Sequence, residues 1–171
     1  MELGKLENVH FYVDGSLWVG TGEIKLPTVE HYKNEVKNLA LMGDLSYPSV
    51  KLKAMTSEIK LSTFDPETLA VAMHPRKAPM MYAASNWAKY VHDRGVIENV
   101  PVKVKIRGFF SKRDTGNLKF EGSDEISLEC DVHYLKFEVD GEELVEIDVV
   151  NWVYKIKGDD IISEIRRVLN G

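Results

Sequence analysis

The side chains that most often perform chemistry in proteins are scattered along this chain without a shared pattern. Its five histidines show no spacing typical of a metal site; they are His10, His31, His74, His92 and His133. The single cysteine, Cys130, excludes an internal disulfide. It lies in an apolar strand pattern, which indicates a buried thiol rather than a nucleophile. His133 lies on the polar side of the same pattern, as a solvent-facing or interface histidine does.

Known catalytic motifs are also missing from the sequence. It contains no phosphate-binding glycine loop, no His-Glu-x-x-His and no Gly-x-Ser-x-Gly. Carboxylates are plentiful, but a sequence alone does not place two of them at catalytic distance. We therefore predict that the protein is not an enzyme and has no catalytic residue, cofactor or metal.

Composition sets the class of protein. A chain of 171 residues with 44% hydrophobic residues is ordinary for one globular domain, here residues 1–171. The net charge of −5, with no basic block, argues against a dedicated nucleic-acid binder. No apolar run is long enough to span a membrane, and no signal peptide is recognisable. We expect a protein that is cytosolic when synthesised.

The stretch at residues 126–157 dominates the pattern. Apolar residues alternate with polar ones, the phase of the alternation changes twice, and Asp140-Gly141 lies between the two arms. This pattern predicts a long antiparallel hairpin whose turn is followed by a bulge or a longer loop. Matching apolar residues across the hairpin gives the pairs Val139–Val145, Phe137–Ile147, Leu135–Val149, Tyr134–Val150, Val132–Trp152 and Cys130–Tyr154.

The two phase changes suggest that the tip of this hairpin is apolar on the opposite face from its base. The base would then cover the subunit's own core, and the tip would need a second apolar body. Within one subunit only the helices or residues 39–55 could supply it. We predict that a neighbouring subunit or ring covers at least part of the tip, so that Phe137→Asp leaves the subunit folded but prevents assembly. The predicted tip interface consists of Leu135, Phe137, Val139, Val145, Ile147 and Val149.

The segment at residues 39–55 is apolar but has little periodicity. Its content argues against disorder, and its irregularity is typical of a functional loop. It reads either as a loop over the core or as an arm that packs on another subunit and becomes ordered only in the assembly. The predicted interface residues in this arm are Leu41, Met42, Tyr47, Val50 and Leu52.

The remaining pattern predicts an α+β fold, a mostly antiparallel β-sandwich or barrel with packed helices. The strand at 100–110 has an apolar row and a basic row, the latter read as solvated or paired with acids. The other expected elements are a hairpin at 8–26, an ambiguous segment at 28–38, a strand at 57–64, a short helix from Asp65-Pro66, a helix at 79–93 and a terminal helix at 159–169.

The C-terminal hairpin also carries a family resemblance. It is similar to the major tail tube protein of contractile-tailed bacteriophages, a family that includes the tube subunits of R-type, phage-tail-like bacteriocins. The opening, with Val13-Asp14-Gly15, Gly20 and Leu26-Pro27, and the middle, with Arg107-Gly108 and Asp114-Thr115-Gly116, resemble that family too. The residues that carry the C-terminal match are Asp140, Gly141, Glu143, Leu144, Val145, Glu146, Ile147, Asp148 and Asn151.

The resemblance implies a structural subunit of a contractile tail. Its hexameric rings would stack into a hollow tube inside a sheath, penetrate the target envelope and conduct DNA. The implied partners are the subunit itself, sheath, tape-measure, baseplate and tail-terminator proteins, and DNA as transiting cargo. The implied place is a virion tail or tail-like particle assembled in the bacterial cytoplasm. Two alternatives stay open: a tube subunit of a bacteriocin or other injection system that carries no DNA, and a monomeric ligand-binding β-barrel.

Overall fold

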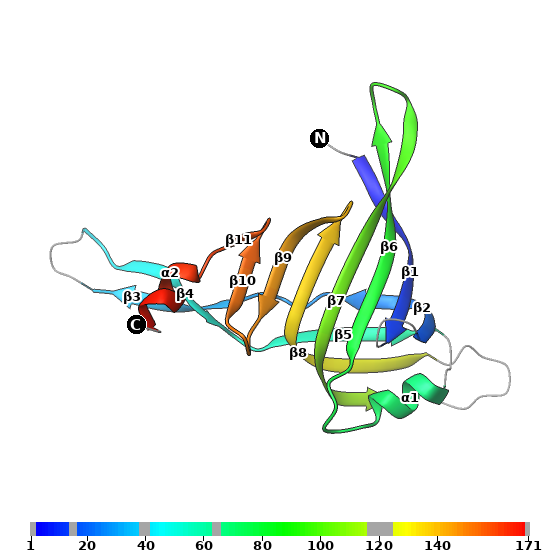
Figure 1. Cartoon of the computed structure of the whole chain (residues 1–171), viewed down its shortest axis with the longest axis horizontal. Helices are drawn as coiled ribbons and strands as arrows, with labels where there is room; N and C mark the ends of the chain where they lie inside the picture. The colour runs from blue at the N-terminus through cyan, green and yellow to red at the C-terminus, as the bar shows by residue number, and fades with distance from the viewer. Residues whose placement is uncertain (1–2, 14–16, 38–41, 63–65, 116–124, 170–171) are drawn as a thin grey trace.

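The computed structural model describes residues 3–13, 17–37, 42–62, 66–115 and 125–169. This part of the chain forms a nine-stranded sheet, a separate two-stranded ribbon and two short helices (Figure 1). The expected antiparallel β fold is therefore confirmed. The turn at Asp14-Gly15, the helix-capping Asp65 and the segment after Asp114-Thr115 that begins at Gly116 lie outside the described residues.

Six strands of the large sheet close on themselves. Each pairs with its neighbour in antiparallel fashion, and β8 returns to pair with β7, so the sheet forms a barrel. In order around the barrel the strands are β8 (Ile126–Val139), β5 (Met55–Leu61), β2 (Leu17–Lys25), β1 (Leu3–Val13), β6 (Met80–Val91) and β7 (Val96–Asp114).

Alternate residues of these strands fill the barrel, as the period-two pattern requires. The largest side chains that are fully buried in the core are Met55, Ile59, Ile106 and Ile147, and Cys130 is also fully buried. One buried polar residue, Ser57, donates its hydroxyl hydrogen to the Lys25 carbonyl at 2.9 Å. Helix α1 (Pro66–Ala72) covers one end, where Val71 and Ala72 pack on the core.

β-Bulges keep the apolar residues on the inner face. In β8, Arg107 lies opposite Tyr134 but Gly108 lies opposite Val132, so His133 is the extra residue. Because a bulge adds one residue to one strand, the side chains beyond it return to the face they would otherwise leave. Asn8, which has a φ of 53, is the extra residue of a bulge in β1, and Leu144 is the extra residue of a bulge in β9. Both bulges have the same effect.

Beyond the bulge at His133, β8 extends out of the barrel. Its first half pairs with β5 from Ile126 to Val132, and its second half pairs with β9 (Glu142–Asp148). The sheet then continues through β10 (Val153–Ile156) to β11 (Asp159–Asp160). The short helix α2 (Ser163–Leu169) follows at this end of the molecule (Figure 1).

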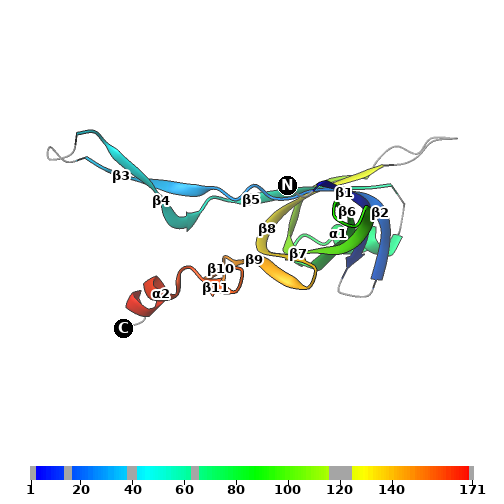
Figure 2. The ribbon, with the colours of Figure 1, turned by 90° about the horizontal axis from the view of Figure 1, so that it is seen from above.

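Strands β3 (His31–Val36) and β4 (Leu45–Leu52) form the two-stranded ribbon, which we call the arm. The arm leaves the barrel on the same side as α2, and the two run as separate layers (Figure 2). The ambiguous segment at 28–38 is therefore largely strand. The segment at 39–55 supplies the second strand of an extended hairpin rather than an irregular loop.

Two predicted elements differ from the structure. The helix expected at 79–93 is strand β6, which pairs along its whole length with β7 and with β1. Its inward residues, Met81 and Ala83, alternate at period two. The terminal helix is shorter than the predicted 159–169, because Asp159 and Asp160 pair with β10 before α2 begins.

Candidate assembly surfaces

The C-terminal hairpin has a tighter turn than the apolar pairing predicted. Asp140 and Gly141 have φ values of 53 and 78, as a two-residue hairpin turn requires. Val139 therefore lies opposite Glu142, and the expected bulge follows at Leu144. The predicted pairing of apolar residues was wrong, because this bulge sets Phe137 opposite Val145 and Leu135 opposite Ile147.

The second arm of the hairpin also ends earlier than predicted. Residues 149–152 form a turn, and β10 folds back on β9, so Tyr154 lies opposite Ile147 rather than Cys130. The predicted partners Tyr134–Val150 and Val132–Trp152 do not pair either. Tyr134 lies opposite Asp148 and Arg107, and Val132 lies opposite Met55 and Gly108.

The predicted tip interface is mostly part of the subunit's own core. Leu135 and Ile147 are buried, and Phe137 and Val145 pack against the same cluster. The bulge at His133 explains this result, since it returns the tip residues to the face of the base. Phe137→Asp is therefore expected to destabilise the subunit itself. Val139 is half-buried, and Val149 is the member that is exposed, at 49%.

The arm carries most of its predicted interface residues on its surface. Met42, Tyr47 and Val50 are exposed, whereas Leu52 packs against the barrel core at the base of the arm. Leu41 lies outside the described residues. In the described part of the arm, these three apolar side chains are therefore left exposed. We call this part, at residues 42–50, the outer arm.

Polar contacts join the two strands at the base of the arm, and one of them also reaches β10. His31 Nδ1 lies 2.8 Å from the Ser49 carbonyl, and its Nε2 lies 3.5 Å from the Tyr154 hydroxyl of β10. The Lys53 ammonium lies 2.6 Å from a Glu30 carboxylate oxygen. This pair lowers the pKa of Glu30 and raises that of Lys53, mainly through the hydrogen bond between them.

An apolar groove of about 450 Å³ lies between the base of the arm and the inner face of β9 and β10. The arm contributes Val50 and Leu52 to one wall. The opposite wall is formed by the β9–β10 region and by the residue that precedes α2, and includes Ile147, Val149, Trp152, Tyr154 and Ile162. Such a groove can receive apolar side chains from another body.

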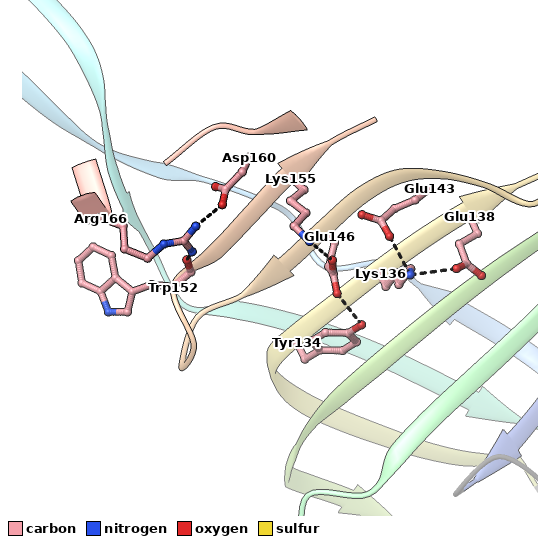
Figure 3. Close-up of polar contacts among 9 residues, drawn as sticks. All are labelled: Tyr134, Lys136, Glu138, Glu143, Glu146, Trp152, Lys155, Asp160 and Arg166. Atoms are coloured by element: carbon pink, nitrogen blue, oxygen red, sulfur yellow. Dashed lines mark hydrogen bonds and ion pairs between the residues drawn. The ribbon is translucent and has the colours of Figure 1, made fainter. Parts of the chain in front are cut away.

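The opposite face of β8, β9 and β10 is charged, and its side chains form ion pairs with one another (Figure 3). Lys136 Nζ lies 2.7 Å from a Glu143 oxygen and 3.2 Å from a Glu138 oxygen. The hydrogen bond with Glu143 is the main reason that the pKa of Lys136 is raised and that of Glu143 lowered. This face therefore presents fixed charges on a regular strand surface.

Glu146 connects two further strands on this charged face. It accepts a hydrogen bond from the Tyr134 hydroxyl at 3.1 Å and pairs with Lys155 at 3.5 Å. Partial burial, followed by the Glu146 charge, raises the pKa of Tyr134 to about 12. The predicted basic row of β7 lies on this face as well, with Lys103 opposite Glu138 and Lys105 opposite Lys136.

The motif residues after β9 build a rigid turn. Asp148 Oδ1 accepts hydrogen bonds from the backbone of Val150 and Asn151, both at 3.0 Å, and Oδ2 accepts one from the Asn151 side chain. Partial burial acts to raise the pKa of Asp148, but these hydrogen bonds outweigh it and the pKa is lowered. The turn presents Val150 and Trp152 to solvent.

Sequence reasoning missed two apolar surfaces. The first is at α2, where Ile162 just before the helix is buried but Ile161, Ile165, Val168 and Leu169 are exposed. Arg166 fixes α2 by pairing with Asp160 and by donating to the Trp152 carbonyl at 2.8 Å. The second missed surface is around Trp87 on β6, in the segment for which a helix at 79–93 was predicted. An amphipathic pattern predicts which residues share a face, not what covers it.

The chemistry-bearing residues do not converge in the described part of the chain. It contains no group of three His, Cys, Asp or Glu side chains suited to a metal ion. Burial, followed by the Asp131 charge, raises the pKa of the Cys130 thiol to about 12, as expected of an unreactive buried cysteine. His133 lies half-buried on the outside of the bulge, 5.7 Å between ring centroids from Phe109. None of the described helices is long and apolar enough to cross a membrane.

The described chain is thus a small filled barrel with a sheet extended beyond it and with apolar side chains exposed at both ends of that sheet. The family of phage tail tube protein FII matches residues 4–169, and the chain belongs to that family. No curated protein matches the sequence.

A solved structure is also similar in fold. It is the sheath-tube complex of an extracellular contractile injection system, PVC, in the extended state. The similarity has a TM-score of 0.55 at 7% identity and covers 76% of this chain and 87% of that chain. At this identity the likeness concerns the fold alone, and it agrees with the tail tube family.

Proposed function

We propose that this protein is the structural subunit of the inner tube of a contractile tail. Hexameric rings of the subunit stack into a hollow tube inside a sheath, and contraction drives that tube through the target envelope. The observation that carries the proposal is the extended sheet, β6 to β11, which is apolar on one face and charged on the other. A monomer would leave the ends of the apolar face in water.

The charged face is the surface best suited to line the channel. Its ion pairs hold the side chains of Lys136, Glu143 and Glu146 against the strands, where they would face the contents of the channel. Acids and bases are mixed there, with Glu138 opposite Lys103, and a mixed surface would bind the phosphates of DNA less tightly than a basic surface does. DNA is accordingly proposed as transiting cargo rather than as a bound ligand.

A tube subunit of a bacteriocin or another injection system that carries no DNA is the second candidate. The observation that supports it is the fold similarity to a chain of the sheath-tube complex of an extracellular contractile injection system. Capsid and terminase genes beside the gene for this chain would favour a phage, and their absence a bacteriocin or injection system.

A monomeric ligand-binding barrel is poorly supported. The cavity described between α1 and the barrel strands measures about 20 Å³ and is lined by Phe11, Ile59, Phe110 and Leu128 among others. Ligand sites commonly have volumes of about 300–1,000 Å³. The interior of the barrel therefore lacks room for a ligand at this place.

The remaining contacts follow from the same role. The exposed outer arm is proposed to pack on a neighbouring subunit, because a two-stranded ribbon is at best marginally stable by itself in water. The outside of the tube would contact the sheath protein, and the channel would hold a tape-measure protein. The ends of the tube would contact baseplate and tail-terminator proteins. Assembly would take place in the bacterial cytoplasm.

Negative-stain microscopy of the purified protein over a range of concentrations tests the proposal. Rings with sixfold end views, or hollow tubes, are the expected result. Particles of subunit size at every concentration and salt condition would refute it. Added sheath protein should bind the tubes and leave unassembled subunits unbound.

A further inference from the structure

One end of the inner face of the sheet lies on β1, β6 and β7, above the barrel. Leu6 lies opposite Trp87, which lies opposite Val100, so the three side chains share a face. Leu6 is 56% exposed, and Trp87 and Val100 are half-buried. We call these three residues the β1 end.

The indole ring of Trp87 is held in one orientation by its neighbours, as a residue at a protein interface often is. A Cβ atom on residue 4 would lie 2.1 Å from the indole Nε1, so the ring lies directly against Gly4. Lys89 Nζ lies 5.7 Å from the centroid of the ring. Tryptophans held in one orientation and partly open to solvent are frequent anchors of protein interfaces.

The other end of the same face lies on β9 and β10. Val145 lies opposite Ile156 and Ile147 opposite Tyr154, and this face forms a wall of the groove beneath the arm. Ile156 and Trp152 are exposed there. The β1 end and the groove thus lie on one face of one sheet, at its two opposite limits.

The backbone edges at these limits are open as well. Within the described chain, residues 3–7 of β1 pair with β6 on one side and with no strand on the other. At the far limit, β11 pairs only with β10. An open edge invites a further strand.

We propose that the β1 end of one copy seats in the groove of the next copy, with the β1 edge beside β11. This inference rests on the proposed tube function and identifies the surfaces that join subunits within a ring. The contact uses two different surfaces, so each copy keeps one of each free for the next. Such a heterologous contact closes into a ring when the rotation per copy divides a full turn.

Inter-chain cross-linking tests this proposal. Because the one natural cysteine is buried, single-cysteine additions give a clean signal. Subunits with Leu6→Cys are mixed with size-tagged subunits carrying Val149→Cys, assembled, and treated with a short bis-maleimide. A mixed-size covalent dimer is expected, and it can only join two chains.

The matched control replaces Leu6→Cys by Ile97→Cys. Ile97 is at least as exposed as Leu6 and close to the same end of the sheet, but lies opposite Tyr90 on the outer face. It should give at least fivefold less mixed dimer. Equal yields from the two positions, or no dimer from Leu6→Cys in preparations that contain tubes, would overturn the proposed contact while leaving the tube function intact.

A measurement on the unmodified protein covers the case in which the variants fail to assemble. Amide exchange of residues 3–7 should slow at least tenfold in wild-type tubes relative to free subunits. Unchanged exchange in tubes contradicts the contact. If the wild-type protein forms no rings or tubes at all, the proposed function fails first, and microscopy reveals that separately.

Discussion

Replacing Ile147 by alanine tests whether the C-terminal hairpin belongs to the core of the isolated subunit. Ile147 is 1% exposed and lies between Leu135 on β8 and Tyr154 on β10. The substitution removes about three methylene equivalents at about 0.8 kcal/mol each, about 2.5 kcal/mol of transfer free energy. The cavity left behind raises the expected loss in the free energy of unfolding to about 3–4 kcal/mol.

Val149→Ala is the matched control, since Val149 lies two residues further along and is 49% exposed. Its expected effect is within about 0.5 kcal/mol. Urea unfolding followed by circular dichroism, at a concentration where sedimentation shows single subunits, measures both variants. An Ile147→Ala subunit as stable as the control would refute the reasoning. The hairpin would then be undocked in the free subunit, and the original interface prediction would regain its basis.

Three further predictions follow from the described contacts. Gly108→Ala should lower the free energy of unfolding by about 1–3 kcal/mol in thermal melts, because its Cβ would lie 2.3 Å from a backbone oxygen, whereas Gly43→Ala, with nothing within 4 Å, should be nearly neutral. The lowered pKa of Glu143 means that its stabilisation by Lys136 is present above pH 4.5 and is lost as pH falls through the lower folded value. Glu143→Gln should remove this part of the acid sensitivity in melts at pH 3–5, and an unchanged pH profile would contradict it. Amides of residues 45–52 should exchange rapidly in free subunits and slowly in tubes, and equal exchange would contradict the proposed arm contact.

The positions of strands and turns were largely predictable from the alternation of apolar residues and from the residues that favour turns. The hairpin at 8–26, the strand at 100–110 and the turn at Asp140-Gly141 appear where the pattern indicated. These signals depend on neighbouring residues only. The closing of the barrel was not predictable, because it depends on β8 pairing with β5 and on β6 pairing with β1, strands far away in sequence.

Strand β6 shows how distant pairing overrides a local signal. Its sequence carries Met80, Ala84, Trp87 and Val91 at helical spacing, and good helix formers between them. As a strand, however, it bonds to β1 on one edge and β7 on the other. Two full ladders and the burial of Met81 and Ala83 outweigh a weak intrinsic preference.

The placement of the interface failed for a different reason. A change of phase in an alternating pattern has two meanings, a change of face or a bulge, and the sequence does not distinguish them. At His133 the answer depends on the neighbouring strand, since β7 keeps its alternation through Ile106 and Gly108 while β8 gains a residue. The carbonyl of the extra residue is satisfied by the Val149 amide at 3.0 Å, which fixes the bulge.

This bulge has a consequence for how subunits can join. With a change of face, the apolar tip would have required a partner above or below the subunit. With the bulge, all inward residues of β6 to β10 share one face, and the uncovered apolar side chains, Leu6 and Ile156 among them, lie at its lateral limits. Burying them requires lateral neighbours. The charged opposite face, already paired within itself, gains little from burial because its ions would lose water. The same strand register therefore favours contacts between subunits placed side by side in a ring, and it leaves the charged face exposed to solvent.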